Sequence, residues 1–509
     1  MSLARDITTV GGGTLISRLL AYVRDAWIAA LLGAGPQAEA FFAVLQVVNF
    51  FRRLLSEGAL NSAFVPIWLK LRGGEDGAAN AGRFTLRAAV LVGIVTGIIA
   101  LTVIVFAPFV VAAVAPGFPP AQRQQTQFLL MIVAPYIVLA GLVAVAAAML
   151  SAEGRVFAVS ISTVIFNVVL LLALAFAAGN EQTGITIWLA VAVVIAGFGQ
   201  LLIAVVALST SLPWQRVRIH VPDQTGTFFK RALPGLIATG IPQLKLIAAT
   251  AIVSASPAAV SWLYYANRLY ELPLGVASIA VAAVIVPRVA ASVHAADEAA
   301  LTSSQSRAYE IALGLALPAA TGFALLGGPI ATGLFQRGAF TEQDTVAVSA
   351  ALTAICAGLP GHVLEKVFGA VSFAHEDTQT PMLTACAGLA AAVAGGVLIF
   401  PRYGYVGVAG AVAISAWIGA VLLGIILYRR RWLRLDRDAA RRLPRIVFAT
   451  ILMGTAVSYA AHTLGMPTSS AGRLAMLLAL VTFGVVLYGA VLRVSGVAKL
   501  KDLVAGARG

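Results

Sequence analysis

Charged side chains are scarce in this sequence, and their scarcity excludes a water-soluble fold. Only 11% of the 509 residues are charged, whereas 60% are hydrophobic and the mean hydropathy is +0.93. A soluble domain has about 25% charged residues and about 45–50% apolar ones. The chain therefore lacks the polar surface that water requires, and we expect its apolar segments to lie in a lipid bilayer.

Cysteine and histidine are also rare, which argues against disulfide and metal chemistry. The two cysteines, Cys356 and Cys386, lie inside apolar runs, so we interpret them as small core residues. The five histidines form no His-x3-His spacing and the two cysteines form no Cys-x2-Cys spacing, the patterns that are typical of zinc sites. We therefore predict no disulfide, no metal and no other cofactor.

The net charge of +14 raises the question of a nucleic-acid partner. Such a partner requires basic residues clustered on one face, whereas here most of them lie at the ends of apolar stretches. The first stretch contains Arg18 and Arg24 and lacks the uninterrupted apolar centre of a signal peptide. We expect no binding of nucleic acid, and we expect the N-terminal stretch to be retained.

Long apolar runs indicate the architecture. A helix that crosses a membrane needs about 20 apolar residues. The sequence predicts an all-α polytopic membrane protein with fourteen transmembrane helices. They are expected near residues 7–32, 38–68, 88–113, 127–150, 157–178, 184–208, 232–254, 260–286, 308–333, 346–372, 380–400, 405–428, 446–463 and 474–492.

The positions of lysine and arginine support this count, because cytoplasmic loops are enriched in both. With fourteen spans, one side of the membrane holds both termini and most of the basic residues, including the eight arginines from Arg429 to Arg445. We expect that side to be the cytoplasm, and we interpret the block as a topology signal and a contact for anionic membrane lipids. The opposite side holds Arg123, Arg337, Arg402 and Arg473.

An internal repeat relates the two halves of the chain. Six predicted spans separate the two copies, so both have the same orientation, as in parallel transporter repeats. We expect a monomer with two six-helix lobes, residues 1–220 and 221–430, and two further helices in 431–509. A constant offset of 221 relates Pro36 to Pro257, Pro66 to Pro287, Pro108 to Pro329, Gly117 to Gly338 and Arg24 to Lys245.

Seven basic residues fall inside the predicted spans. Four arginines in the first two spans would together cost on the order of 10 kcal/mol if they faced lipid. Helical spacing allows ion pairs between Arg53 and Glu57 and between Arg268 and Glu271. The available acids are too few for all seven cations, so part of the excess should line a water-filled cavity. The seven are Arg18, Arg24, Arg52, Arg53, Lys245, Arg268 and Lys366.

Guanidinium groups match phosphate oxygens bidentately and stay charged when buried. We therefore predict that Arg18, Arg24, Arg52, Arg53 and Arg268 bind a phosphate or pyrophosphate group. Asp25, Glu39, Glu57 and Glu271 would support them through ion pairs, and Lys245 and Lys366 would add positive charge. The glycine-rich segments lack the spacing of a nucleotide fingerprint, so an ion gradient or the membrane potential should drive transport.

Several segments resemble the MurJ (MviN) family of lipid II flippases. The opening Gly13-Thr-Leu-Ile-Ser-Arg-Leu-Leu-Ala-Tyr-Val-Arg-Asp25 is similar to that of the family, as is Asn49-Phe-Phe-Arg-Arg-Leu-Leu-Ser-Glu-Gly58. Further similar segments are Ser261-Trp-Leu-Tyr-Tyr-Ala-Asn-Arg268 with Glu271, and Asp377-Thr-Gln-Thr-Pro381. The collinear similarity extends over roughly residues 5–430.

The resemblance implies the fold of the multidrug/oligosaccharidyl-lipid/polysaccharide exporters and a place in the bacterial inner membrane. It also implies a substrate, an undecaprenyl-pyrophosphate-linked disaccharide-pentapeptide, which is moved to the outer leaflet by alternating access. By the same resemblance, Arg18, Arg24, Arg52, Arg53 and Arg268 line a cationic cavity that is needed for function. The last two helices, about 446–492, resemble those that form a groove for the lipid tail.

The sequence departs from its relatives at three places. Glu39 stands where many relatives have Asp, and Asn267 where many have Asp, which makes Glu271 the expected partner of Arg268. Neither 232–254 nor 380–400 contains an acidic residue, so the sodium site of some relatives is not expected.

Two other functions remain as alternatives. A multidrug exporter of the same fold would need an acidic, aromatic cavity rather than a basic one. A membrane enzyme acting on polyprenyl phosphates would need acidic clusters for Mg²⁺, but the adjacent acids Glu75-Asp76 and Glu376-Asp377 fall in predicted loops.

Overall fold

The computed structural model is helical, as the sequence predicts, and its described residues contain no strand. Contacts divide the chain into two compact units. Unit 1 comprises Met1–Ser261 with Arg337–Phe340, and unit 2 comprises Trp262–Gln336 with Thr341–Gly509. The structure describes residues 3–56, 59–74, 77–209, 240–281, 286–295, 297–465, 467 and 469–497.

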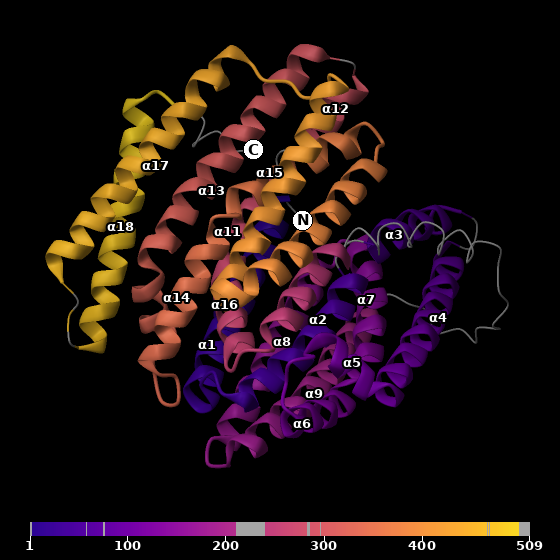
Figure 1. The fold of residues 1–509 in the computed structure, drawn as a ribbon. Helices are drawn as coiled ribbons and strands as arrows, with labels where there is room; N and C mark the ends of the chain where they lie inside the picture. The colour runs from indigo at the N-terminus through magenta and orange to yellow at the C-terminus, as the bar shows by residue number, and fades with distance from the viewer. Residues whose placement is uncertain are drawn as a thin grey trace. The chain divides into compact units, whose positions relative to one another are not determined.

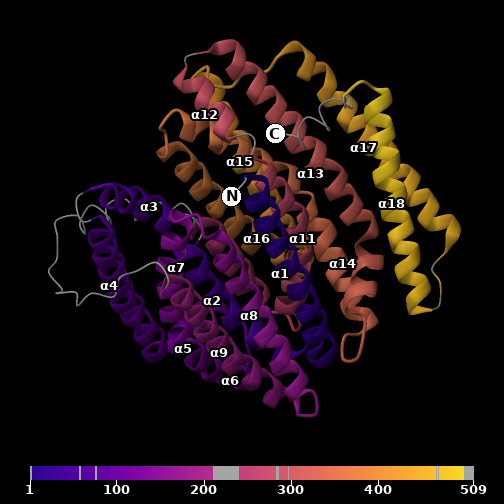
Figure 2. The same ribbon diagram turned by 180° about the vertical axis from the view of Figure 1, so that it is seen from behind.

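Unit 1 is a bundle in which α8 packs on α9 and α1, and α7 packs on α4 and α9 (Figures 1 and 2). Trp68, Phe84 and Met149 are buried where α3, α4 and α7 meet. The helices of unit 1 are α1 (Leu3–Leu32), α2 (Pro36–Ser56), α3 (Ala59–Arg72), α4 (Gly77–Val105), α5 (Ala107–Val114), α6 (Pro120–Val133), α7 (Tyr136–Ala152), α8 (Val156–Ala177), α9 (Gln182–Ser209) and Gly240–Val253.

Unit 2 is built around α13, which packs against α14, α15, α17 and α18 (Figures 1 and 2). The buried side chains of Leu326, Met453, Val457 and Leu480 join α13, α17 and α18. Its helices are α11 (Ala259–Ala280), which begins in unit 1, α12 (Val286–His294), α13 (Glu298–Phe335), α14 (Glu342–Cys356), α15 (Leu359–Ala374), α16 (Gln379–Arg429), α17 (Arg437–Leu464) and α18 (Ser470–Val494).

Nine helices of the described part of the chain are long and apolar enough to cross a membrane. One of them, α16, has 51 residues and would be about 75 Å long if it were straight, which is more than twice the thickness of the hydrocarbon layer. Gly404 interrupts it with φ 54° and ψ −144°, between the predicted spans 380–400 and 405–428. The total of fourteen remains a prediction, because α1, α2 and α11 carry the charges that interrupt their apolar runs.

The internal repeat explains why unit 1 extends beyond residue 220. The backbone N–H of Gly117 donates to Ser254 Oγ at 2.9 Å, which ties the turn before α11 to the turn before α6. In the other copy, the N–H of Ala339 donates to Ala30 O at 2.8 Å. A Cβ atom on Gly338, the repeat equivalent of Gly117, would lie 2.2 Å from Ala30 O. In both copies, the turn that contains the glycine therefore contacts a segment of the other copy: Gly117 contacts Ser254, and Gly338 contacts Ala30. The lobe boundary at 220 stays a prediction from sequence.

Candidate functional site

Arg24 lies in the interior of unit 1 with its whole guanidinium group bonded. Its Nη2 and Nε atoms donate to Asp25 Oδ1 at 2.6 and 2.9 Å, and Nη1 donates to Asn167 Oδ1 at 2.9 Å. The side chains of Arg24 and Asp25 are 6% and 0% exposed. A buried charge needs a partner and hydrogen bonds for its remaining atoms. The predicted phosphate ligand Arg24 is thus neutralised by Asp25 in this conformation.

Asn167 on α8 connects this ion pair to the backbone of α1. Its Nδ2 donates to Ser17 O at 3.2 Å and to Thr163 O at 3.3 Å. Asn167 was not among the predicted site residues. The signal that could have found it is an amide side chain inside the otherwise apolar run of α8, because polar groups at that depth need a partner.

Arg18 is half-buried one and a half turns before Arg24 on α1. Within the part of the chain that the structure describes, its guanidinium group has no hydrogen bond or ion pair. Its five N–H donors are therefore available to an acceptor from outside the described residues.

The two arginines of α2 are half-buried as well. Arg52 Nε donates to Asn49 Oδ1 at 3.2 Å, and both Arg52 and Arg53 have further interactions. The predicted partner of Arg53, Glu57, lies outside the described residues. α1 and α2 therefore present Arg18, Arg52 and Arg53 as incompletely buried cations of unit 1.

Arg268 lies on α11 in unit 2. Its Nη1 atom contacts Glu271 Oε2 at 3.1 Å, which is the pair that the helical spacing indicates, and the two side chains are 24% and 23% exposed. Asn267 Nδ2 also donates to Glu271 Oε1 at 3.4 Å. The Arg268–Glu271 pair is therefore partly exposed, whereas the Arg24–Asp25 pair is buried.

Glu39 forms no ion pair among the described residues, and its supporting role by ion pairing stays a prediction from sequence. Its Oε1 accepts the backbone N–H of Val260 at 3.1 Å, and its Oε2 accepts Gln122 Nε2 at 3.2 Å. Val260 belongs to the first turn of α11, where N–H groups lack partners within the helix. The buried carboxylate therefore caps α11, and Glu39 and Val260 are equivalent positions of the repeat.

The two predicted lysines have different surroundings. Lys245 is 4% exposed in unit 1, and its ammonium group has no hydrogen bond or ion pair with any residue that the structure describes. Lys366 is exposed on α15 in unit 2 and has an interaction partner.

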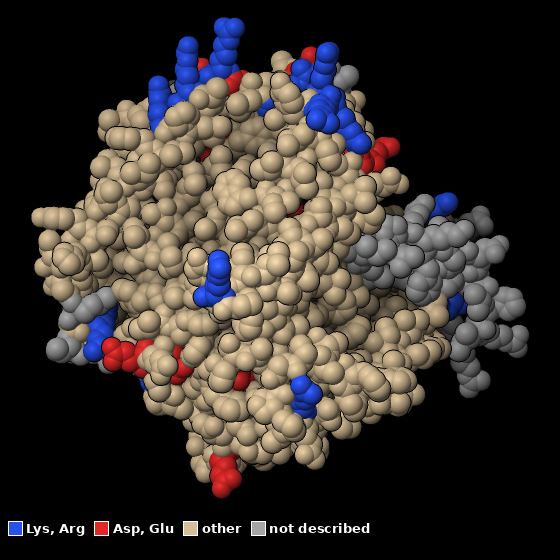
Figure 3. Space-filling model, in the orientation of Figure 1, with Lys and Arg blue, Asp and Glu red and all other residues tan. Residues whose placement is uncertain are grey.

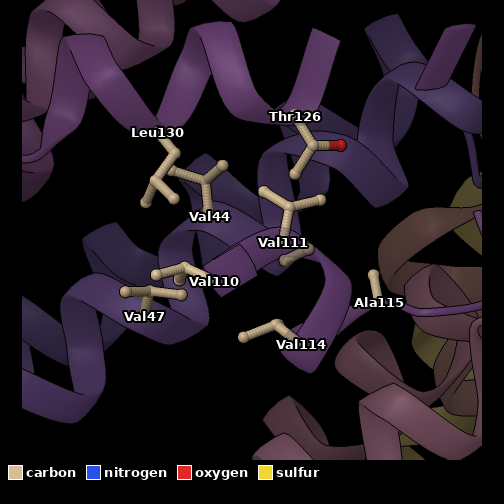
Figure 4. A pocket seen from close by; sticks show the side chains of 9 residues that line it. Val44, Val47, Val110, Val111, Val114, Ala115, Thr126 and Leu130 are labelled. Carbon is tan, nitrogen blue, oxygen red and sulfur yellow. The ribbon is translucent and has the colours of Figure 1, made fainter. Parts of the chain in front are cut away.

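A small cavity in unit 1 is apolar rather than cationic. It lies between α2, α5 and α6 (Figure 4). Its lining includes Val44, Val47, Val111, Val114 and Leu130. Its one polar lining residue, Thr126, donates its hydroxyl to Gln122 O, and none of the lining residues is charged, so the cavity is separate from the arginines.

The basic block of unit 2 lies at the end where α13 and α17 begin, and Figure 3 shows Lys and Arg gathered there. Arg434 contacts Glu298 at 3.0 Å and Arg442 contacts Glu310 at 3.2 Å. Arg430 pairs with Asp377 in the turn before α16. Burial raises the pKa of Asp377, but hydrogen bonds from Thr380 and Arg430 and the charge of Arg430 outweigh it, so the pKa lies below its ordinary value.

No cluster of three or more His, Cys, Asp or Glu side chains suited to a metal ion occurs among the described residues. What the arrangement offers instead is guanidinium donors within apolar helices, three of them without full burial in unit 1 and one in unit 2. Such donors can bind an anionic group that enters between helices.

Comparison with solved structures defines the class first. An inward-facing multidrug resistance MATE family transporter of the MOP superfamily aligns over 84% of this chain and 98% of its own, with a TM-score of 0.65 and 14% identity. The lipid II flippase MurJ in an inward closed conformation aligns over 97% of this chain and 99% of its own, with a TM-score of 0.80 and 20% identity. This chain therefore has the fold of these two solved proteins.

Sequence comparison gives the family. The family model "Lipid II flippase MurJ" matches residues 28–479. The probable lipid II flippase MurJ of Rhizobium meliloti is 37% identical over 485 residues, covering 93% of this chain and 90% of the relative. That of Haemophilus influenzae is 30% identical over 506 residues, covering 96% and 98%. The chain belongs to the MurJ family of lipid II flippases, as the sequence motifs indicated.

Proposed function

We propose that this chain moves lipid II, the undecaprenyl-pyrophosphate-linked precursor of peptidoglycan, from the cytoplasmic to the outer leaflet. The observation that carries the proposal is the set of guanidinium groups held inside the apolar helices α1, α2 and α11 of a MurJ-family chain. A diphosphate is the part of lipid II that such donors match. The polyprenyl tail would stay in the lipid.

The arginines take different parts in this proposal. Arg18, Arg52 and Arg53 would bind the pyrophosphate directly, because they are only half-buried. Arg268 would exchange Glu271 for a phosphate oxygen. Arg24 would join them only if a conformational change separated it from Asp25, and otherwise it positions α1 against α8. Lys245 and Lys366 would add positive potential.

Alternating access would come from movement of the two repeat-related halves, driven by the membrane potential or an ion gradient. The proposed orientation places both termini and the basic end of unit 2 in the cytoplasm of a bacterial cell, with the protein in the inner membrane. The tail would lie along α17 and α18, since α18 is largely exposed. A monomer would suffice for this mechanism.

The alternative of a multidrug exporter has less support. Organic cations would require acidic groups, and the acidic residues Asp25, Glu39 and Glu271 are engaged with Arg24, with the first turn of α11 and with Arg268. An enzyme acting on polyprenyl phosphates would need a cluster of metal ligands, and the described residues contain none.

The test is the leaflet position of labelled lipid II in vesicles that contain the purified protein, with and without an applied potential. Intact lipid should reach the opposite leaflet. The Arg52→Ala/Arg268→Ala variant should lose this activity and fail to rescue cells that lack their own flippase. Arg402→Ala, at an exposed arginine of α16, is the matched control and should retain both. Normal transport by the double variant would refute the proposed roles, and chemically altered lipid would indicate an enzyme.

A further inference from the structure

A second group of ionisable side chains lies in unit 2, on a different part of α11 from Arg268. The hydroxyl group of Tyr270 lies 2.6 Å from Nδ1 of His362 on α15. Tyr270 is 3% exposed, and the two rings are 6.0 Å apart. In this short hydrogen bond either group can be the donor, because the phenol has an O–H and the imidazole nitrogen either accepts a proton or carries one.

His362 lies deep within a membrane-crossing segment. The helices α14 and α15 form one apolar span, Glu342–Ala374. Twelve residues separate His362 from the end of α15, which is about 18 Å at 1.5 Å per residue. Ionisable groups at such depth are rare and usually mark a pathway for ions, protons or substrate.

The carboxylate of Glu365 lies on the same helix as His362 and packs closely against α16. Glu365 follows His362 by one turn of α15 and lies against α16 at Gly419, where a Cβ atom would come within 2.8 Å of Glu365 Oε1. Gly419 therefore permits a carboxylate to lie between two closely packed helices.

The other helices packed on α15 bring few charges to this part of it. The stretch of α16 that packs along α15, from Ala413 to Gly424, contains no ionisable residue. From α13, the ionisable Tyr309 packs against Phe368, and Arg307 and Glu310 pair with each other one turn apart. The ionisable groups of α12 are the exposed Arg288 and His294. Those of α11 are Tyr264, Tyr265, Arg268, Tyr270 and Glu271.

α11 connects this group to the proposed substrate site. Successive residues of an α-helix are turned by about 100°, so Tyr270 projects about 160° away from Arg268. The helix thus holds the Arg268–Glu271 pair on one side and the bond to His362 on the other. A change in that bond acts on the same rigid helix that carries Arg268.

We propose that His362, Tyr270 and Glu365 form the proton-binding site that couples a proton gradient to transport. The inference rests on the proposed function, for which it names the coupling ion. When the imidazole is neutral, the Tyr270 hydroxyl donates to Nδ1. A proton bound at Nδ1 reverses this bond, so Nδ1 donates to the phenol oxygen and the phenol proton turns to a different acceptor, with Glu365 as the nearby carboxylate. One proton is gained and no covalent bond to carbon changes.

Direct proton binding is tested by NMR titration of the detergent-solubilised full chain with isotope-labelled histidine. His362→Gln should remove one titrating signal, which identifies it. Tyr270→Phe should shift the midpoint of that signal, because the hydroxyl partner is lost, while the midpoints of the other histidines stay unchanged. A His362 signal that does not titrate between pH 5 and 9, or that Tyr270→Phe leaves in place, would overturn the proposal.

Coupling is tested in vesicles at constant membrane potential, with a pH gradient of either sign and with sodium present or replaced by choline. A gradient that is acidic on the outer side should accelerate lipid II transport by the unchanged protein. His362→Gln and Glu365→Gln should lose this response, whereas His462→Gln, at an exposed histidine of α17, should keep it. Thermal unfolding of each variant shows whether it is folded.

The outcomes separate the two proposals. If the unchanged protein moves no lipid II under any gradient, the proposed function fails. If transport occurs and responds to sodium but not to pH, or if His362→Gln responds to pH like the unchanged protein, the function stands and the proton site is wrong.

Discussion

The Arg24–Asp25 pair of unit 1 and the Arg268–Glu271 pair of unit 2 have the same chemistry in different surroundings. The first is 6% and 0% exposed and has an amide, Asn167, on the remaining guanidinium nitrogen. The second is 24% and 23% exposed. Burial raises the cost of separating opposite charges, because neither can be solvated afterwards.

From this difference we infer two roles for arginine in this chain. Arg24 and Asp25 hold α1 against α8, and their separation would be costly. In the proposed function, Arg268 exchanges its carboxylate for another anion, at a small change in free energy because both partners are partly exposed. The prediction that the five arginines bind phosphate therefore needs a division between buried and accessible side chains.

The largest effect on stability is expected from Asp25→Ala. It would leave Arg24 buried without a counter-charge, which destabilises proteins by about 3–5 kcal/mol. Thermal unfolding of the purified protein measures the loss. The double variant Arg24→Leu/Asp25→Ala should recover much of it, since no unpaired charge remains. A double variant as unstable as the single one would show that the pair does not act through neutralisation.

A smaller loss is expected from Asn167→Ala. It removes the acceptor of Arg24 Nη1 and the donor to Ser17 O while keeping the ion pair. Hydrogen bonds to charged groups contribute about 1.5–3 kcal/mol. Unfolding measurements with Asn180→Ala as the control, an exposed amide after α8, check this value. Equal stability of the two variants would show that Asn167 does not help to hold α1 against α8.

Glu271→Gln should change stability by less than about 1 kcal/mol, because the pair is partly exposed. The same change should strengthen the binding of pyrophosphate, since the carboxylate of Glu271 no longer competes with pyrophosphate for Arg268. Calorimetric titration with inorganic pyrophosphate measures the affinity. Glu298→Gln breaks the exposed pair with Arg434 and should leave the affinity unchanged. Weaker binding by Glu271→Gln would contradict the exchange.

The smallest effect concerns the third pair, Arg430–Asp377, in which the arginine is 42% exposed. The pKa of Asp377 is lower in the folded chain, so its contribution is present above the unfolded pKa of about 3.9 and is lost as pH falls through the lower folded value. Exposed pairs contribute up to about 1 kcal/mol. Unfolding from pH 7 down to pH 3 should show a gap between the protein and Asp377→Asn that closes in acid. A constant gap would contradict this.

Asp25 and Glu271 were both expected to form ion pairs with arginines, but rules of local spacing assigned a partner only to Glu271. Arg268 and Glu271 are three residues apart, so they share a helix face and could be paired from sequence. Arg24 and Asp25 are adjacent, and adjacent helical residues do not face each other. Asn167, 143 positions further along the chain, accepts a hydrogen bond from the remaining nitrogen of Arg24.

Long-range contacts explain the other differences. Glu39 was expected beside a cation, but its partner is the N–H of Val260, 221 positions away. That distance equals the repeat offset, so the repeat contained a signal for the contact that charge counting did not use. Tyr270 and His362 are 92 positions apart and had no such signal.

The sequence by itself determined that the protein is a helical membrane transporter of the MurJ family with surplus arginine in its apolar helices. These properties follow from composition, periodicity and motifs, because the free energy of moving a segment into lipid is a sum over its own residues. Only the tertiary structure decided that Arg24 is neutralised and that Glu39 caps α11. Arg24 and Asp25 are neighbours on α1, but the hydrogen bond of Arg24 to Asn167 and that of Glu39 to Val260 join different helices. Packing rather than local sequence sets those distances.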